Sequence, residues 1–383
     1  MTAVQILAKL ISFPVLGGES NLSIVHWIQT YLEDAGVATI LVPNEKGNKA
    51  SLHCRIGPAI DGGLVLSGHT DVVPVAGQQW ESNPFVLTDK KDGKLYGRGS
   101  CDMKGFLACC LAMLPKFLKA TLKKPIYFAF SYDEEIGCLG APALIAHLQK
   151  HYTETPKYAL IGEPSLMQPI VAHKGICLFN TTVNGSAGHS SGILKEVSAV
   201  HEAARLILWL EDKMKKVVAS GNSDDRFNPP HSSLHTGIVQ GGIAANVIAD
   251  NATFSWDARI IPMDNLEAIL FDFRNHCAQR TEELKKIFPG FRIETIEQHP
   301  PVPPLNTQNK MAIVQLMQKI NPNQQLGGVS YAAEAGQFAQ AGFESIICGP
   351  GSIDQAHRSN EFIAKSELDK CTQLLQKLCF EFS

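Results

Sequence analysis

The stretch YFAFSYDEEIG, from Tyr127 to Gly137, joins an apolar, aromatic strand pattern directly to three consecutive acids and a glycine. A buried strand that ends in neighbouring carboxylates is electrostatically costly, because the anions repel one another and each loses hydration. A bound cation would offset that cost. An acidic loop in solvent is the alternative for this stretch alone, so the interpretation depends on what the rest of the chain places beside it.

The composition narrows the class of protein. With 383 residues, the chain is long enough for two domains. Its 45% hydrophobic and 19% charged residues are typical of a globular protein with a large core. The formal net charge of −3 offers no basic field for nucleic acid, and no apolar run reaches the roughly 18 residues that cross a bilayer. We therefore expect a small-molecule partner, no nucleic acid and no membrane.

The cysteines and the N-terminus both favour a cytoplasmic protein. The ten cysteines form no C-x-x-C pair, and several lie inside apolar stretches such as 107–111. In a chain of this length, that pattern indicates reduced thiols packed in the core. Residues 1–20 lack a basic segment and a small-residue cleavage site, so we interpret them as a helix rather than a signal peptide.

Outward from the opening stretch, short apolar strands alternate with helical patterns, and this alternation resumes near the C-terminus. The strands are expected at 63–68, 127–131, 158–161 and 345–348, and the helices at 106–119, 141–151, 311–320, 335–341 and 365–380. Such alternation predicts an α/β fold with a mostly parallel sheet and helices on both faces. Ligands of these sheets bind beyond the carboxyl ends of the strands.

Acids and imidazoles gather at those strand ends. The residues that follow strands or begin a helix are His69, Asp71, Asp102, Glu134, Glu135, Glu163 and His357. Zinc accepts His nitrogen and carboxylate oxygen, and two-metal hydrolytic sites share a bridging carboxylate. Asp71 could orient the His69 ring. Of the adjacent Glu134 and Glu135, one could bind metal while the other accepts a proton.

A second module interrupts this pattern. Alternating strands are expected at 177–183, 232–239, 241–248 and 252–261, with long helices at 199–217 and 265–288. Two helices on an antiparallel sheet predict a smaller α+β domain at 174–286. It would be inserted into a discontinuous catalytic domain, 1–173 and 287–383, with the proline-rich stretch 298–306 as the crossover between them.

The motifs resemble those of the M20 family of metallo-deacylases and exopeptidases. The family signatures stand here as His69-Thr70-Asp71, Gly97-Arg98-Gly99-Ser100-Cys101-Asp102-Met103-Lys104-Gly105 and Glu134-Glu135-Ile136-Gly137. Within the family, the chain is most similar to the acetylornithine deacetylases. That similarity is carried by Ala172-His173-Lys174-Gly175, Gly188-His189-Ser190-Ser191, Ala333-Glu334-Ala335, and Gly349-Pro350-Gly351 with Ala356-His357.

The resemblance implies two divalent metal ions, zinc first and cobalt as the alternative. The implied ligand sets are His69, Asp102 and Glu163 for one ion, and Asp102, Glu135 and His357 for the other. Asp102 would bridge the two ions and Glu134 would be the general base. A carboxylate in that role takes a proton from water and returns it to the leaving amine.

The resemblance also implies roles for the inserted domain, as a lid that dimerises. His189 would reach the active site of the partner in a homodimer and stabilise an oxyanion there. Asn246 and Arg259 would contact the substrate, and Arg259 is suited to hold an α-carboxylate through paired hydrogen bonds. An internal ion pair with Asp257, two residues earlier, is the alternative for Arg259. The stretches 192–199 and 358–361 depart from the usual sequence of the deacetylase branch, and both border the substrate region.

The implied reaction is hydrolysis of the amide bond of an N-acetylated amino acid. The substrate implied first is N2-acetyl-L-ornithine, which yields L-ornithine and acetate, a step of arginine biosynthesis. A succinyl-diaminopimelate desuccinylase or a dipeptidase of the same family is the first alternative. The second is a non-catalytic binding protein on the same scaffold. A serine hydrolase is disfavoured because no Gly-x-Ser-x-Gly stands at a strand–helix turn.

Overall fold

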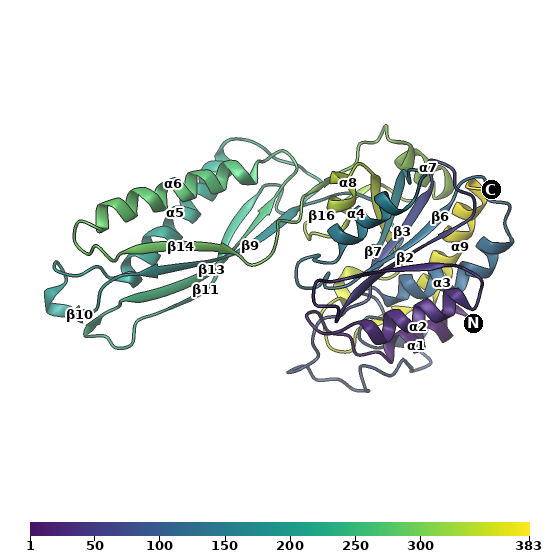
Figure 1. The fold of residues 1–383 in the computed structure, drawn as a ribbon, viewed down its shortest axis with the longest axis horizontal. Coiled ribbons are helices and arrows are strands. Elements are labelled where there is room, and N and C mark those ends of the chain that lie inside the picture. The colour runs from purple at the N-terminus through teal and green to yellow at the C-terminus, as the bar shows by residue number, and fades with distance from the viewer. The chain divides into compact units, whose positions relative to one another are not determined.

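The computed structural model describes all 383 residues, Met1 to Ser383, and the chain divides into two compact units (Figure 1). Unit 1 comprises Met1–Ala172, Leu305–Gly328 and Ala333–Ser383. Unit 2 comprises His173–Pro304 and Val329–Ala332. None of the helices combines the length and the apolar character that crossing a membrane requires.

Unit 1 is built on a nine-stranded sheet in which β1-β2-β6-β3-β7-β17-β8-β15 are neighbours and β16 pairs with β8. The strands are β1 (Thr39–Pro43), β2 (Ala50–Ile56), β3 (Leu64–His69), β6 (Ile126–Ser131), β7 (Tyr158–Pro164), β8 (Ile170–His173), β15 (Leu305–Asn306), β16 (Gly327–Val329) and β17 (Glu344–Gly349). The central neighbours β6, β3, β7 and β17 are parallel, whereas β1, β2 and β8 pair antiparallel. The predicted α/β class is confirmed, with antiparallel strands toward the edges.

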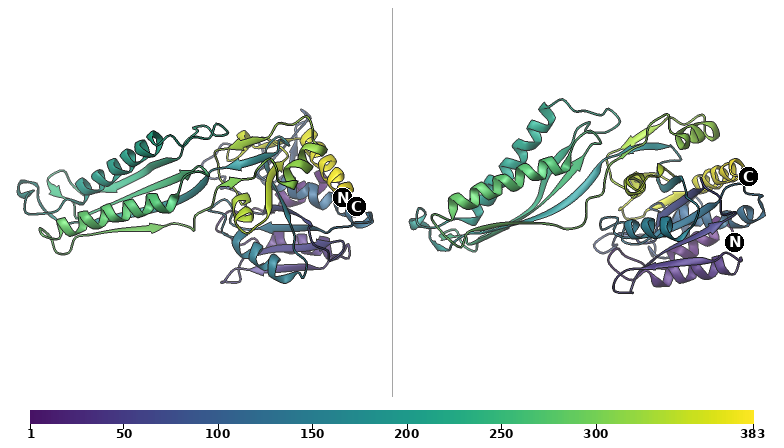
Figure 2. Two further views of the ribbon diagram at one scale, coloured as in Figure 1. Left: turned by 90° about the horizontal axis from the view of Figure 1, so that it is seen from above. Right: turned by 45° about the horizontal axis from the view of Figure 1, so that its top comes forward.

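Helices cover both faces of this sheet (Figures 1 and 2). They are α1 (Ala3–Ile11), α2 (Leu22–Glu33), α3 (Lys104–Lys119), α4 (Ala141–His151), α7 (Ala312–Ile320), α8 (Ala335–Gln340) and α9 (Lys365–Glu381). Side chains alternate between the faces of a strand. Phe128 and Phe130 therefore join the large core made by α1, α2, α3, α7 and α9. Tyr127 points the other way, and its ring lies 5.0 Å from that of Tyr152, directly after α4.

A small three-stranded sheet in unit 1 joins two distant parts of the chain. Its order is β18-β5-β4, with β4 (Thr88–Asp89), β5 (Lys94–Tyr96) and β18 (Phe362–Ala364). Tyr96 pairs with Phe362 in the antiparallel ladder. The turn that follows Tyr96 is thereby brought beside the segment that precedes Phe362.

Unit 2 is a four-stranded antiparallel sheet, in the order β11-β13-β9-β14, covered by two helices. Its elements are β9 (Gly175–Asn184), β10 (Gly188–His189), α5 (Ala199–Ala219), β11 (Ser233–Gly241), β12 (Val247–Ile248), β13 (Asn251–Ile260), α6 (Leu266–Leu284) and β14 (Arg292–Glu297). Every second residue of β13 is buried, as one packed face requires. Phe179 and Trp256 stack in the core beneath α5 and α6, with ring centroids 4.2 Å apart.

Two expectations for unit 2 differ from the structure. The sequence analysis did not predict β14, whose isoleucines Ile293 and Ile296 are spaced as in a helix and which forms by pairing with β9. Because β14 belongs to unit 2, the chain returns to unit 1 at Leu305, and not at residue 287 as expected. Of the strand expected at 241–248, Gly241 is the last residue of β11 and only Val247–Ile248 form β12. The positive φ of Gly242, +72°, ends the extended conformation of β11.

Candidate metal centre

The carboxyl ends of the parallel strands in unit 1 gather the ligand-type side chains. His69 is the last residue of β3, and Glu163 lies at the end of β7. Asp102 lies just before α3, and Glu134 and Glu135 lie just beyond β6, whereas His357 lies in the loop between β17 and β18. The topology explains this meeting, because parallel strands end at the same edge of a sheet.

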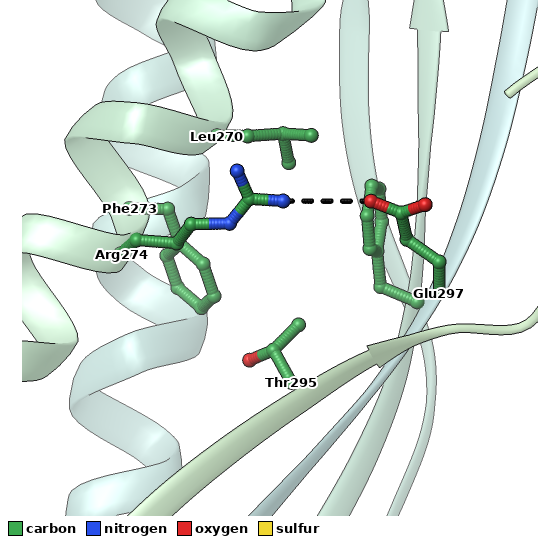
Figure 3. A pocket seen from close by; sticks show the side chains of 6 residues that line it. Leu270, Phe273, Arg274, Thr295 and Glu297 are labelled. Carbon is green, nitrogen blue, oxygen red and sulfur yellow. Dashed lines mark hydrogen bonds and ion pairs between the residues drawn. The ribbon is translucent and has the colours of Figure 1, made fainter.

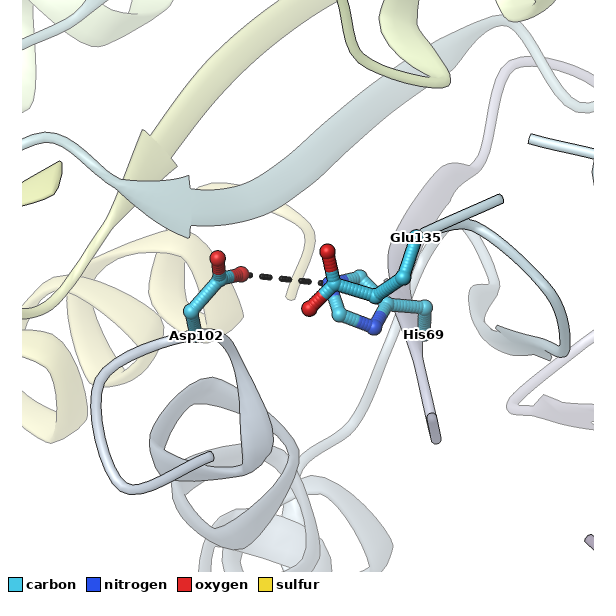
Figure 4. Close-up of side chains that lie close together, drawn as sticks. All are labelled: His69, Asp102 and Glu135. Atoms are coloured by element: carbon cyan, nitrogen blue, oxygen red, sulfur yellow. Dashed lines mark hydrogen bonds and ion pairs between the residues drawn. The ribbon is translucent and has the colours of Figure 1, made fainter. Parts of the chain in front are cut away.

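The Asp102 carboxylate lies between the two imidazoles. Its Oδ1 is 3.2 Å from Nε2 of His69, and its Oδ2 is 3.5 Å from Nε2 of His357. Figure 4 shows Asp102 directed at the His69 ring, with Glu135 beside it. A carboxylate that offers one oxygen to each of two imidazoles has the arrangement of a ligand shared by two ions.

The remaining carboxylates surround this arrangement. Oε2 of Glu135 is 3.0 Å from Nε2 of His357. Oε1 of Glu163 and Oε2 of Glu134 lie 3.8 Å and 3.9 Å from Nε2 of His69. Ligand atoms lie within 4.8 Å of one another in two trios, His69 with Asp102 and Glu135, and His69 with Glu134 and Glu163. These trios differ in part from the implied sets, so the division of ligands between two ions stays a prediction.

The protonation equilibria of the acids reflect crowded negative charge. Burial raises the pKa of Glu134, Glu135 and Glu163, and their acidic neighbours raise it further. Burial would also raise the pKa of Asp102, but hydrogen bonds with His357 and His69 hold it below its usual range. Oε1 of Glu163 is buried and has no hydrogen-bond partner, which is unusual for a buried oxygen. Divalent cations would neutralise the charge and satisfy this oxygen.

The two histidines complete a donor set that suits zinc or cobalt. Burial lowers the pKa of His69, but its bond to Asp102 and the nearby acids outweigh that effect and raise it. Hydrogen bonds to Asp102 and Glu135 raise the pKa of His357 to about 10. Imidazole nitrogen with carboxylate oxygen is a ligand set that first-row divalent metals accept. The residues therefore fit a site for such ions.

Asp71 holds His69 in a different way from the one expected. Nδ1 of His69 bonds to the main-chain oxygen of Asp71 at 2.8 Å, whereas the carboxylate Oδ1 is 3.7 Å away. The carboxylate instead accepts from the main-chain N–H groups of Glu134 and Glu135, each at 3.2 Å. A buried carboxylate takes the donors that have no other partner. Asp71 therefore orients the ring through its backbone and the acidic turn through its side chain.

The structure adds residues that the sequence analysis missed. The thiol of Cys138 lies 3.3 Å from Oε1 of Glu134. Oε1 of Glu361 accepts from the main-chain N–H of Asp102 at 3.0 Å, and Oε2 of Glu361 pairs with Arg98 at 2.9 Å. Glu361 follows His357 closely in sequence, and this proximity to a predicted ligand is the only signal that could have indicated it. No spacing rule indicates Arg98 or Cys138.

The three candidate residues of unit 2 lie in two places. His189 of β10 is exposed, pairs with Val247 of β12, and bonds through Nδ1 to Oγ of Ser191 at 2.8 Å. The main-chain oxygen of Asn246 accepts from Ser190 N–H at 3.1 Å, so Asn246 lies beside His189. Arg259 lies near the far end of β13, about 26 Å along the strand from its first residue. Its Nε bonds to Asp257 at 3.1 Å.

A hollow in unit 2 has no set of metal-ligand side chains comparable to that at the metal centre. It has a volume of about 300 Å³ and lies between α6 and the sheet. Figure 3 shows Arg274 of α6 reaching across it to Glu297 of β14, beside Phe273 and Thr295, and the ion pair is 3.4 Å long. Its lining has one partnered acid and no histidine, so it reads as a packing feature between helix and strand.

Comparison with known proteins gives one consistent family. Residues 65–381 match the family described as Peptidase family M20/M25/M40. The acetylornithine deacetylase of Pasteurella multocida is 32% identical over 389 aligned positions, covering 99% of this chain and 97% of that protein. The acetylornithine deacetylase of Klebsiella pneumoniae is also 32% identical, with 99% and 97% covered.

Solved structures support the fold. An M20 family metallo-carboxypeptidase from Sulfolobus solfataricus superposes with a TM-score of 0.76 at 16% identity, covering 98% of each chain. A dinuclear metal-binding peptidase of the M20 family from Bacillus subtilis superposes with a TM-score of 0.64 at 15% identity, covering 98% of this chain and 96% of that chain. At these identities the likeness concerns the fold.

Proposed function

This chain belongs to the peptidase family M20/M25/M40, and from that premise we propose that it hydrolyses N2-acetyl-L-ornithine to L-ornithine and acetate, as in arginine biosynthesis. The family is one of hydrolases. The choice of substrate is supported by the relatives named acetylornithine deacetylase, which align along nearly the whole chain.

The observation that carries the proposal is the shared position of Asp102. Its two carboxylate oxygens face His69 and His357, at 3.2 Å and 3.5 Å, and three further acids close the group. If these residues only formed ion pairs that stabilise the fold, one carboxylate for each histidine would suffice. Four carboxylates around two histidines exceed that need, and the excess charge supports a role in binding two cations.

Two divalent ions, zinc or cobalt, would polarise the amide carbonyl and lower the pKa of a water molecule in this site. Glu134 is the acid we assign to proton transfer, with Oε2 accepting the proton of the attacking water and passing it to the leaving nitrogen. Its Oε1 is occupied by the Cys138 thiol. The new C–O bond forms first and leaves an oxyanion, and the C–N bond breaks once its nitrogen has received the proton from Glu134, which releases acetate and the free amine.

Unit 2 would supply the substrate contacts in a homodimer. His189 is exposed on β10, where an imidazole N–H can reach the partner's site and stabilise the oxyanion. Asn246, beside it, would contact the substrate. Arg259 would hold the α-carboxylate, and its bond to Asp257 orients the guanidinium for that contact.

We also propose that the enzyme works in the cytoplasm. Its ten cysteines are all buried free thiols, the form that a reducing compartment maintains.

A substrate panel with the purified, zinc-loaded protein tests the function. We expect kcat/KM for N2-acetyl-L-ornithine to exceed that for N-succinyl-L,L-diaminopimelate and for unsubstituted dipeptides by at least about a hundredfold, as expected where buried polar groups match one substrate. Acetate release and ornithine release should be equimolar.

The other outcomes of the same panel separate the alternatives. A preference for the succinylated substrate or for a dipeptide would replace the proposed substrate and keep the hydrolase. Metal analysis that finds no bound transition metal, together with no turnover of any substrate, would favour a non-catalytic binding protein on this scaffold.

A further inference from the structure

Glu361 has every lone-pair direction of its carboxylate directed at one loop. The side chain is fully buried. Its Oε1 accepts from the main-chain N–H groups of Cys101 and Asp102 at 2.8 Å and 3.0 Å. Its Oε2 accepts from the N–H of Gly99 and from Nη1 of Arg98, both at 2.9 Å. One carboxylate thus fixes the backbone of the loop that ends in Asp102.

Arg98 extends this network to the backbone of His357. Its Nη1 also donates to the main-chain oxygen of Arg358 at 3.2 Å, and its Nη2 donates to Oε1 of Gln78 at 2.6 Å. Nε2 of Gln78 then donates to the main-chain oxygen of His357 at 2.8 Å. The carbonyl groups of His357 and Arg358, which directly follow the His357 Cα, are therefore tied to the same guanidinium, one through Gln78 and one directly.

His357 needs such support more than the other candidate ligands do. It belongs to no strand or helix, its side chain is 57% exposed, and its φ of +62° is a left-handed conformation that a non-glycine residue rarely adopts. His69, in contrast, ends a central strand and is fully buried. Without external bonds, the loop that carries His357 would sample other conformations.

The alternative is that Glu361 and Arg98 form an ion pair that only stabilises the fold. A buried ion pair contributes little to stability relative to an apolar pair of the same size, so stability alone is a weak reason for one here. The donors to Glu361 also belong to the loop of a candidate ligand rather than to a distant element.

We propose that Glu361 and Arg98 are positioning residues that hold Asp102 and His357 in place for metal binding. The inference rests on the proposed metal site. Asp102 would bind both ions, whereas His357 would bind only one. The ion bound by His357 therefore depends both on the bonds from Glu361 to the Asp102 loop and on the bonds through Gln78 to the His357 backbone. Loss of the network should therefore weaken the binding of that ion more than the binding of the other.

Zn²⁺ titration in competition with a fluorescent chelator tests this on the full chain. In Glu361→Gln, an amide N–H₂ faces N–H donors, and we expect one of the two Zn²⁺ affinities to fall about 10- to 100-fold, as is typical when an outer hydrogen-bond partner is removed, and the other to fall less. Gln78→Ala removes the hydrogen bond to the main-chain oxygen of His357 and leaves the bonds of Glu361 intact. It should weaken the same ion and leave the binding of the other ion unchanged.

Glu154→Gln is the matched control. Glu154 is also buried and also accepts from an arginine, Arg55 at 2.9 Å, and from the Tyr127 hydroxyl at 2.7 Å, but at the opposite end of β6 from the metal centre. We expect this variant to lose thermal stability and keep both wild-type Zn²⁺ affinities. A circular dichroism melt of each variant shows whether it is folded.

The outcomes separate this inference from the proposed function. Wild-type affinity in a folded Glu361→Gln, or equal weakening in Glu154→Gln, would overturn the positioning role while leaving the metal site intact. If Glu361→Gln does not fold, Gln78→Ala decides: a weakened ion supports the role, and two wild-type affinities overturn it. A wild-type protein that binds no Zn²⁺ would overturn the proposed function, and this inference with it.

Discussion

Cys138 contacts both the side chain and the backbone of Glu134: its thiol is 3.3 Å from Oε1 of the carboxylate, and its main-chain N–H donates to the main-chain oxygen of Glu134 at 2.9 Å. A hydrogen bond donated to a carboxylate favours the ionised form. We therefore expect Cys138→Ala to raise the pKa of Glu134 and to move the acid limb of the kcat profile to higher pH. A neutral hydrogen bond supports a shift of up to about one pH unit.

Steady-state rates between pH 5 and 9 would measure this shift. Cys54→Ala is the control, because Cys54 is equally buried in β2 and should affect stability without moving the profile. Cys138→Ser keeps a donor and should restore most of the wild-type profile. An alanine variant whose acid limb coincides with that of the wild type would show that the thiol only packs.

Glu134→Ala should separate metal binding from turnover. The variant removes the acid assigned to proton transfer, and general acid–base catalysis typically contributes a factor of about 10² to 10⁴. We expect kcat to fall by a factor of at least about 10², while the Zn²⁺ content, measured by elemental analysis, stays at the wild-type value. Unchanged turnover would refute the assignment, and loss of metal would make Glu134 a ligand.

The sequence sufficed for elements whose pattern is local. The strand at Tyr127 and its acids were predictable, because an apolar run that ends in carboxylates is visible in eleven neighbouring residues of the sequence. The alternation of strands and helices then predicts the edge at which these acids meet. The meeting of His69 and His357 at one carboxylate follows from that topology and from the family resemblance together.

The features that escaped prediction depend on long-range pairing. β14 forms because Ile293 lies opposite Val183 in β9. Its own six residues give conflicting signals, because three of them are β-branched whereas its two isoleucines are spaced as in a helix. Glu361 and Asp102 are 259 residues apart, so no local period links them. The bond from His69 to the backbone of Asp71, rather than to its side chain, depends on where the neighbouring N–H groups point.

Gly162→Ala should disturb the metal centre by steric contact. A Cβ at this position would lie 1.9 Å from Cγ of the Phe106 ring, and both the ring and the strand are buried. Overpacking of this kind costs about 1–3 kcal/mol or more, and the adjacent Glu163 must shift with the backbone. We expect a lower melting temperature and weaker Zn²⁺ binding.

Gly237→Ala serves as the comparison, because its Cβ would meet only the His235 ring at 3.5 Å, an ordinary contact. That variant should melt and bind Zn²⁺ as the wild type does. Unaltered Zn²⁺ affinity in a folded Gly162→Ala would mean that Glu163 does not contribute to metal binding.

His53 should make unit 1 sensitive to acid independently of the metal centre. The ring is fully buried and bonds to Nδ1 of His147 at 2.9 Å and to the Tyr152 hydroxyl at 3.0 Å. Burial first, and then the charges of His147 and His151, lower its pKa to about 3. In the unfolded chain the pKa returns to about 6.5.

Because the folded pKa lies below the unfolded one, the unfolded chain binds a proton that the folded chain excludes. The stabilising contribution is complete above about pH 7 and is lost as the pH falls toward 3, with a slope of up to about 1.4 kcal/mol per pH unit. Urea denaturation of the chelator-treated protein at pH 7, 6 and 5 measures this slope without metal linkage. His53→Gln should reduce the slope, whereas His26→Gln, an exposed residue of α2, should retain it. Equal slopes in His53→Gln and the wild type would show that the pKa of His53 is the same in the folded and unfolded chains.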